Sequence, residues 1–500
     1  MPHPRLHPPP SAYTTLNLTT SGALLRPVPL GAPCFATHPA HNTTLCAALL
    51  ANWTKSDTHA RHPTSAMSPL YQGDTCNPAV GAASPSAVCA VGGSPMYVVR
   101  ADNVAQVQLA VNFARNTGVR LVVRNTGHDF LGRSAGAESL GLWVGGIKGL
   151  EYDRVRGTVR MGAGTTVREV YELAEREGFT AVGGECGSVG AAGGGGGGTF
   201  GVVTAVTVRV WPKMGVAGVK FVVSSGTGAR AENGNGVFWE GMYAYWRRFE
   251  GFADKGSYGY SQVFPNGEGG YTWSMLPWLV PGMGRVEFED MVKPLLEEWK
   301  GLGLKVKPEF FEHDSLYQAW TRHFPSDGVA NSNLRVGSRL FPRSVWQNST
   351  RRDELFDTIR AVIEDGSALI QYNIKAVAPP GTPESAANSH WRDTLFFGIF
   401  GGFTAEGEEG EKMSRKVTDD WLGRLKKFGT GAYGNEADVM EPDFGEAFWG
   451  KNYPRLLRIK KEVDPDDLFW VQAGVGSEGW KVASNSRKWL STQDGLLCRV

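Results

Sequence analysis

A polar loop that carries one histidine follows an apolar, strand-like run. The loop is Arg124 to Ser134, with the sequence Arg-Asn-Thr-Gly-His-Asp-Phe-Leu-Gly-Arg-Ser, and the run before it is Val119 to Val123. Backbone amides, small side chains and one imidazole can cradle a phosphate-bearing ligand and hold it beside a nucleophile. His128 is the candidate nucleophile, although a lone loop histidine can equally be satisfied by a neighbouring carbonyl.

A second reactive side chain lies in a glycine-rich stretch. Cys186 occurs within Gly183 to Ala192, which leads into six consecutive glycines, Gly193 to Gly198. Glycines at this density permit close approach of the backbone to a flat or phosphorylated ligand, since no Cβ blocks it. A low-complexity linker has the same composition and stays the alternative. A thiolate at Cys186 suits attack on an electron-poor ring if its pKa is lowered, and the alternative is a small buried thiol.

The histidine loop comes directly after a βα unit. Tyr97 to Arg100 predicts a strand, and a cap at Asp102 or Asn103 predicts a helix that Gly118 ends. The run Val119 to Val123 predicts the next strand, so the loop lies at the carboxyl end of a strand, a common place for ligands to bind.

Further elements are expected downstream. Thr166 and Glu169 form a capping box that predicts a helix to about Glu177, after the turn Gly162 to Gly164. Residues 215–430 alternate strands with helices, and several strands are aromatic and partly alternating. This pattern is typical of an antiparallel sheet with helices on one face and a ligand on the other. Strands are expected at 219–223, 257–264, 271–275, 367–375 and 394–398, and helices at 238–249, 288–302 and 353–364.

The composition bears on the class of partner. The 500 residues carry 51 basic and 50 acidic side chains, a net charge of +1, so neither nucleic acid nor an anionic membrane is expected as a partner. Hydrophobic residues make up 41% of the chain, which is enough for the cores of two or three domains. No run of about 18 apolar residues predicts a membrane span. We expect a monomer that acts on a small molecule.

Cysteines cluster in an N-terminal region that is rich in Pro, Ser, Thr and Ala. Cys34, Cys46, Cys76 and Cys89 indicate two disulfides, most simply Cys34 with Cys46 and Cys76 with Cys89, although four cysteines allow three pairings. Free thiols are the alternative, and zinc is disfavoured because no CxxC or HxxxH spacing accompanies them.

Sequons and the N-terminus give conflicting indications of the compartment. The sequons, which suit a secreted glycoprotein, are at Asn17, Asn42, Asn52 and Asn348. The N-terminus contains no apolar run of the length that a signal peptide needs. We expect a protein of a secreted type whose signal is not visible in this chain.

Four separated blocks resemble the berberine-bridge-enzyme-like FAD-linked oxidases of the vanillyl-alcohol oxidase superfamily. They are Tyr97 to Arg100, Arg124 to Ser134, Gly183 to Gly193 and Tyr433 to Glu478, and they occur in the order of the family. The resemblance implies an α+β fold with a split PCMH-type FAD-binding domain and a substrate domain whose antiparallel sheet is covered by helices. The domains implied are an N-terminal extension (1–94), the FAD-binding domain (95–210, truncated near 193–198), the substrate domain (211–430), a C-terminal segment completing the FAD domain (431–480) and a tail (481–500).

The same resemblance assigns roles to individual residues. It implies that His128 is joined to the flavin 8α-methyl carbon and that Cys186 adds a second bond at flavin C6. Val189 takes the position that governs access of oxygen, where a valine resembles the oxidase type. Asn452 and Tyr453 are expected to position the flavin edge. The remaining cofactor contacts implied are Arg124, Asn125, Thr126, Gly127, Ser134, Gly164, Gly190, Gly201 and Val203.

Tyr433 and Asn435 match a Tyr-x-Asn element that lies near flavin and substrate in the family. An oxidase that takes a hydride at the flavin needs a base for the hydroxyl proton, and a tyrosine with a lowered pKa can serve. Tyr433 is the candidate base, with Asn435 beside it, and a structural aromatic residue is the alternative.

The chain departs from the family after Gly193. Strands and a helix that the family has there are absent, and Gly193 passes directly into the run before Phe200. This loss removes a wall of the FAD site and is expected to expose a sheet edge and core. The expected function is an FAD-dependent oxidation of an alcohol, carbohydrate or secondary-metabolite carbon, with oxygen as acceptor and hydrogen peroxide as product. A non-catalytic, degenerate member is the alternative, and a nicotinamide dehydrogenase is disfavoured because no helix and acidic residue follow the glycines as that motif requires.

Overall fold

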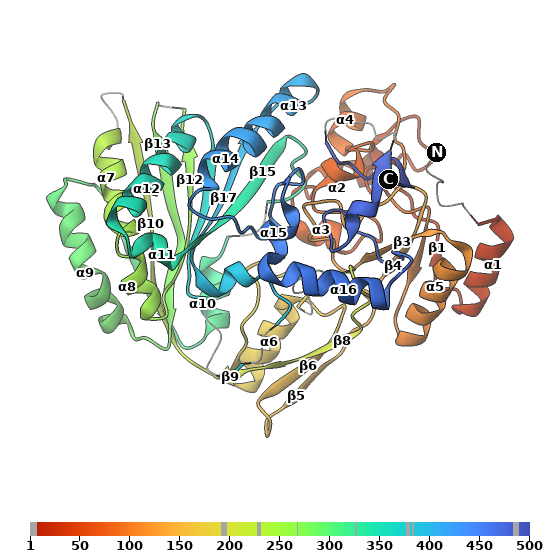
Figure 1. The fold of residues 1–500 in the computed structure, drawn as a ribbon, viewed down its shortest axis with the longest axis horizontal. Helices are drawn as coiled ribbons and strands as arrows, with labels where there is room; N and C mark the ends of the chain where they lie inside the picture. The colour runs from red at the N-terminus through yellow and green to blue at the C-terminus, as the bar shows by residue number, and fades with distance from the viewer. Residues whose placement is uncertain are drawn as a thin grey trace.

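A computed structural model describes residues 8–191, 198–227, 232–267, 269–325, 328–376, 381–382, 385–483 and 490–500. Two halves lie side by side (Figure 1). One half holds a large eight-stranded sheet with its helices, and the other holds the N-terminal helices, smaller sheets and the C-terminal helix α16. The predicted run Gly193 to Gly197, where the chain departs from the family, lies outside the described residues.

The large sheet confirms the expected antiparallel architecture. Its strand order is β11-β10-β13-β12-β16-β17-β15 with β14 also pairing β10, and every pairing except that of β10 with β11 is antiparallel. The strands are β10 (Val216–Gly226), β11 (Asn233–Gly234), β12 (Tyr258–Pro265), β13 (Tyr271–Pro281), β14 (Glu309–His313), β15 (Leu334–Pro342), β16 (Ala368–Asn373) and β17 (Thr394–Phe403).

Helices bury one face of this sheet in the largest hydrophobic core, as predicted. The side chains of Trp239, Trp246, Trp273 and Trp299 are completely enclosed there, so large aromatic volume stabilises this half. The helices are α7 (Asn235–Trp246), α8 (Phe249–Asp254), α9 (Arg285–Gly301), α11 (Arg343–Trp346), α12 (Ser349–Glu364), α13 (Glu408–Arg415) and α14 (Leu422–Leu425), with a π-helical turn at Lys416–Trp421.

The opposite face of the sheet carries an aromatic cluster. We call it the aromatic face and define it as Tyr258, Tyr260, Tyr372, Phe397 and Tyr433. Tyr372 stacks between Tyr260 and Phe397, with ring centroids 5.0 and 5.3 Å away.

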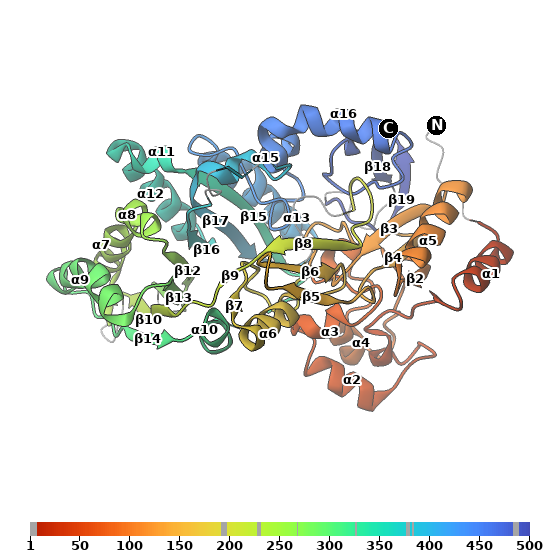
Figure 2. The ribbon, with the colours of Figure 1, turned by 90° about the horizontal axis from the view of Figure 1, so that it is seen from below.

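The small parallel sheet forms from the predicted βα unit. Strands β2 (Tyr97–Arg100), β4 (Ser139–Trp143) and β3 (Arg120–Arg124) are parallel, and β1 (Leu24–Leu25) is added at the edge. Helix α5 (Val104–Thr117) begins where the Asn103 side chain accepts a hydrogen bond from Gln106 N, and it ends at Gly118 with φ of 70°. Helix α1 (Pro10–Thr19) lies beside α5 (Figure 2).

A three-stranded antiparallel sheet follows. Its order is β5 (Leu150–Asp153), β6 (Thr158–Gly162) and β8 (Ala205–Arg209), while β7 (Phe179–Thr180) pairs with β9 (Trp211–Pro212). Helix α6 (Val167–Glu177) has the predicted capping box. Strand β8 is an edge strand within the described residues, and Val203, two residues before it, is 50% exposed. The expected loss of a covering segment after Gly193 stays a prediction.

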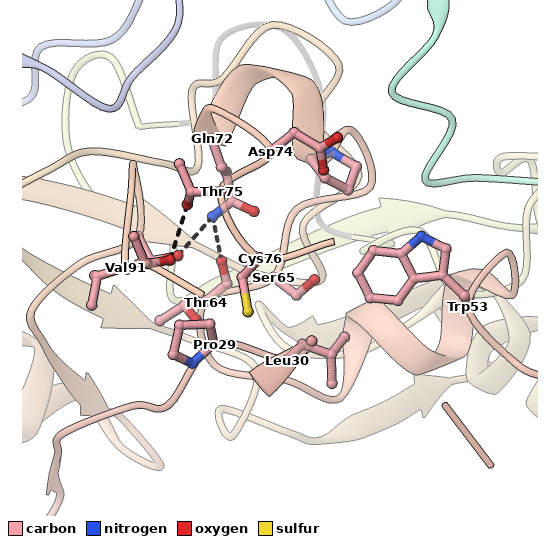
Figure 3. Close-up of a pocket in the computed structure, with 14 residues that line it drawn as sticks. Pro29, Leu30, Trp53, Thr64, Ser65, Gln72, Asp74, Thr75, Cys76 and Val91 are labelled. Carbon is pink, nitrogen blue, oxygen red and sulfur yellow. Dashed lines mark hydrogen bonds between the residues drawn. The ribbon is translucent and has the colours of Figure 1, made fainter. Parts of the chain in front are cut away.

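The N-terminal extension has the two predicted disulfides, Cys34 with Cys46 and Cys76 with Cys89. Its helices are α2 (Thr43–Leu50), α3 (Ser56–Ala60) and α4 (Pro78–Ala83). A cavity of about 40 Å³ lies within the extension beside Cys76, and at its wall Gln72 donates to the Thr64 carbonyl (Figure 3). Since one water occupies about 30 Å³ of the liquid, this cavity is too small for an organic ligand.

The C-terminal segment returns to the half that contains β3. Helices α15 (Phe444–Trp449) and α16 (Tyr453–Val463) precede a hairpin of β18 (Trp480–Ala483) and β19 (Leu496–Arg499). Gln493 accepts from the Arg120 guanidinium of β3 at 2.6 Å, and buried Lys460 of α16 donates to the Thr199 carbonyl at 2.7 Å. Among the described residues, no helix is long and apolar enough to cross a membrane.

Candidate functional site

His128 and Cys186 meet although 58 residues separate them in the chain. Nε2 of His128 lies 3.3 Å from Sγ of Cys186 and 2.5 Å from the Ser188 hydroxyl. Strand β3 delivers the histidine, and the turn between α6 and β8 delivers the thiol. The two side chains that were predicted to bind one ligand are therefore adjacent.

The imidazole of His128 is neutral at physiological pH. Burial, together with the nearby Arg124 charge, lowers the pKa of His128 to about 4. A neutral imidazole keeps a lone pair on one ring nitrogen, and the hydroxyl of Ser188 can donate to Nε2. A neutral imidazole therefore has the protonation state that a nucleophile needs.

The N-terminal extension supports the histidine loop from behind. Buried Arg124 donates to the carbonyl oxygens of Ser65 at 2.8 Å and His59 at 2.7 Å, and its guanidinium lies over the Trp143 ring at 5.6 Å. Gly127 has φ of +80°, and a Cβ there would lie 2.7 Å from the Ser65 carbonyl. Arg124, predicted as a cofactor contact, thus directs its side chain to the extension.

An internal carboxylate shapes the second part of the loop. Asp129 accepts from the amides of Leu131 at 3.0 Å and Ser134 at 2.6 Å. Burial raises the pKa of Asp129 above its ordinary value, and these amides oppose the shift. Ser134 therefore contributes a backbone bond that closes the loop, while Thr126 is buried inside it.

Asn125 links the histidine loop to the glycine turn after β6. Its Nδ2 donates to the Ala163 carbonyl at 2.7 Å, and a Cβ on Gly190 would lie only 2.2 Å from this nitrogen. A Cβ on Gly164 would lie 2.4 Å from the Gly145 carbonyl. The predicted residues Asn125, Gly164 and Gly190 are thus brought together, and glycine is required for the close approach.

Two buried oxygens test whether these residues fit a polar cofactor. Oδ1 of Asn125 and Oγ1 of Thr199 are buried without a hydrogen-bond partner among the described residues. A buried polar atom is costly unless a partner satisfies it. With a neutral imidazole and a thiol at one point, this donor and acceptor set fits a flavin, whose ring supplies electrophilic carbons and polar edge atoms.

A carboxylate joins the thiol segment to the aromatic face. Oε2 of Glu185 accepts from the Tyr258 hydroxyl and Oε1 accepts from the Tyr372 hydroxyl, both at 3.0 Å. The Trp320 indole donates to the Glu185 carbonyl at 2.5 Å. The sequence analysis missed Glu185 and Ser188; their only signal was that they flank Cys186.

Tyr433 lies at the far end of the aromatic face. Its ring packs on Trp391 and Phe397 at 5.5 and 6.0 Å, and its hydroxyl accepts from Asn435 Nδ2 at 3.2 Å. Burial and the Glu436 charge raise the pKa of Tyr433. This sign contradicts the lowered pKa expected for a base, and the catalytic role of Tyr433 and Asn435 stays a prediction.

The remaining predicted residues make contacts within their own segments or lie at the surface. Asn452 donates to the Ala387 carbonyl at 2.7 Å, and the Tyr453 hydroxyl pairs with Glu478. The carbonyl of Val189 accepts from Val167 N at 2.9 Å. Gly201 has open space at its Cα, and Val203 is half exposed. Their predicted flavin contacts stay predictions.

Two protein families match parts of the chain. Residues 95–232 match the family described as FAD binding domain, and residues 432–476 match the family described as berberine and berberine like. The first match contains the histidine loop and Cys186, and the second contains Tyr433.

Curated relatives match almost the whole chain. The FAD-linked oxidoreductase ZEB1 of Gibberella zeae is 29% identical over 95% of this chain and 92% of its own length. The VAO-type flavoprotein oxidase VAO615 of Thermothelomyces thermophilus is 27% identical over 95% of this chain and 92% of its length. The first alignment runs over 540 positions, and the chain has 500 residues, so at least 40 positions have no residue of this chain.

Solved structures share the fold. The VAO-type flavoprotein MtVAO615 from Myceliophthora thermophila C1 superimposes with a TM-score of 0.87 at 26% identity, and the match covers 100% of both chains. BBE-like 1 of Physcomitrella patens has a TM-score of 0.60 at 17% identity over 77% of this chain and 92% of its own.

Proposed function

Because this chain belongs to the berberine-bridge-enzyme-like FAD-linked oxidases of the vanillyl-alcohol oxidase superfamily and is an oxidoreductase, we propose that it oxidises an alcohol, a carbohydrate or a secondary-metabolite carbon. When bound, FAD would supply the acceptor for the substrate hydride, and oxygen would take up the electrons to give hydrogen peroxide. The small-molecule substrate and oxygen are the partners of this proposal, and the protein acts as a monomer.

The contact between His128 and Cys186 is the observation that carries the proposal. In it, His128 holds the flavin through Nε2 and Cys186 holds it through Sγ. The neutral imidazole provides the lone pair for its bond. Val189 next to this point is the residue proposed to admit oxygen.

Release of flavin on denaturation tests the covalent attachment. Protein expressed in an oxidising host is unfolded and precipitated, and the pellet is expected to keep the flavin absorbance. The single variants H128A and C186A should each retain some bound flavin, and the double variant should retain none. A colourless wild-type pellet whose supernatant carries the flavin refutes the covalent bonds but leaves FAD binding intact; a colourless pellet and supernatant refute both.

A non-catalytic, degenerate member is the second candidate function. Alignment positions without a residue of this chain and the exposed Val203 directly before β8 favour it. Sequencing the transcript across the codons of Gly193 discriminates the two. Recovery of an additional coding segment there would remove the reason for the second candidate.

The remaining assignments complete the proposal. The two disulfides and the sequons support secretion, and mass spectrometry of secreted protein tests both. The domain boundaries at 94, 210, 430 and 480 are proposed, and limited proteolysis tests them, since exposed linkers are cut first.

A further inference from the structure

A cavity lies where the thiol segment meets the substrate half. Its volume is about 360 Å³, within the range of small-molecule sites. Cys186 and Glu185 line one side, and α10 (Leu316–His323) with the residues after it lines the other. Figure 2 shows α10 beside α6, and Arg168 and Glu172 of α6 also line the cavity.

The walls of the cavity are aromatic and its charge is almost balanced. Tyr317, Trp320 and Phe324 provide flat apolar surfaces. The lining includes three carboxylates and two cations, and Arg168 is paired with Asp57 at 3.1 Å. An additional anion is disfavoured in such a site, whereas a neutral molecule with a ring fits it.

Glu185, which lines this cavity, is held at three atoms: both carboxylate oxygens and the backbone carbonyl oxygen. Tyr258 and Tyr372 donate to its two oxygens, and Trp320 holds its backbone carbonyl. Burial first, and then the charge of Glu185, raise the pKa of both phenols well above the ordinary value. Both tyrosines therefore stay protonated and donate hydrogen bonds. Among these three side chains, Glu185 is the one that can accept a proton.

Tyr433, the base predicted from the sequence, has other neighbours than Glu185. The hydroxyl of Tyr433 contacts Asn435, an amide that cannot take up a proton. Tyr433 does not line the cavity beside Cys186. A substrate held next to Cys186 therefore needs another residue to accept its proton.

We propose that Glu185 is a catalytic residue whose carboxylate accepts the hydroxyl proton of a neutral, ring-bearing alcohol bound in this cavity. The inference rests on the proposed function. The substrate O–H bond breaks and its proton passes to Glu185, while the C–H bond breaks and its electron pair goes with the hydride to FAD, so that a carbonyl forms. Tyr258 and Tyr372 are positioning residues, and the proton then leaves to water in the open cavity.

Kinetics of flavin reduction provide the first test. Flavin-loaded protein is mixed anaerobically with a series of neutral alcohols that begins with benzyl alcohol. We expect E185Q to lower the limiting reduction rate by about 10²- to 10⁴-fold, the range of a general base, with a smaller change in KM. Y372F and Y258F should lower it less. Y260F is the matched control, because the Tyr260 hydroxyl of the same aromatic face accepts a hydrogen bond from Gln262.

The same kinetics can refute the role of Glu185 and leave the proposed function intact. If alcohols reduce the wild type and E185Q reacts as Y260F does, Glu185 is not the acceptor. A larger loss in Y433F than in E185Q assigns the proton to Tyr433 instead. If no alcohol reduces a flavin-loaded wild type, the proposed function fails, and the role of Glu185 as proton acceptor fails with it.

Binding of benzyl alcohol is measured by ligand-detected NMR in the full chain, with or without flavin. A hydrogen bond to a charged group contributes at least about 1.4 kcal/mol, so E185Q should weaken binding about tenfold or more. T321W places a large ring at an exposed residue that lines the cavity and should abolish binding, which keeps the test valid if E185Q misfolds. Equal binding by wild type, E185Q and T321W overturns the inference.

Discussion

Asp438 allows a quantitative test of how the C-terminal segment packs. Its carboxylate is buried against the π-helical turn, where it accepts from the Thr418 hydroxyl at 2.6 Å and from Met440 N at 2.9 Å. Burial raises the pKa of Asp438 from 3.8 to about 6, and these two bonds only partly offset it. Asn can keep both contacts, since its oxygen can accept from Met440 N and Thr418 can accept from its amide.

The sign of the pH dependence follows from the raised pKa. Between pH 4 and 6 the folded state binds more protons at Asp438 than the unfolded state, so the free energy of unfolding falls as the pH rises. The shift of about 2 pKa units corresponds to about 3 kcal/mol. This destabilisation is absent at a pH below the pKa of Asp438 in the unfolded state, and it is complete at a pH above its pKa in the folded state. D438N should therefore gain about 3 kcal/mol relative to wild type between pH 4 and pH 7.

Urea unfolding at several pH values between 4 and 7 measures this difference. The matched control is D419N, because Asp419 is an exposed carboxylate on the same helical stretch. The free energy of unfolding of D419N should change with pH in the same way as that of the wild type. Parallel curves for D438N as well would show that Asp438 titrates normally and that the described burial is wrong.

Three further perturbations test other parts of the fold. K460M leaves the buried Asp464 without its cation and should cost about 3–5 kcal/mol, measured by urea unfolding, with a smaller loss when Asp464 is also replaced by Leu. G127A places a Cβ against the extension at positive φ and should cost about 1–3 kcal/mol and lower the flavin content of purified protein. The double variant C76A/C89A opens a loop of 13 residues and should lose about 3 kcal/mol, with no further loss on adding a reductant that leaves the other disulfide intact.

Local signals in the sequence predicted the elements that present the site. Asn103 and Gly118 set the ends of α5, and the Thr166–Glu169 box begins α6, because caps act through neighbouring backbone groups. The disulfide pairings were also predictable, since each closes a short loop. The family resemblance predicted that His128 and Cys186 bind the same cofactor and therefore lie close together.

Long-range contacts explain what the sequence did not predict. The carboxylate of Glu185 meets Tyr258 and Tyr372 across 73 and 187 residues of chain, and no local pattern encodes such a meeting. The direction of the Arg124 side chain depends on how residues of the extension fold back. The pKa of Tyr433 depends on burial by Trp391 and Phe397, which only the packed sheet fixes.

The N-terminal extension, which supports the histidine loop, is synthesised before that loop. Ser65 and His59, whose carbonyl oxygens hold Arg124, leave the ribosome before the loop does. Each disulfide of the extension closes over 12 or 13 residues, so neither has to wait for the rest of the chain. The segment that holds Arg124 is therefore synthesised before the histidine loop, and it is flanked by two disulfides that need no later residue to form.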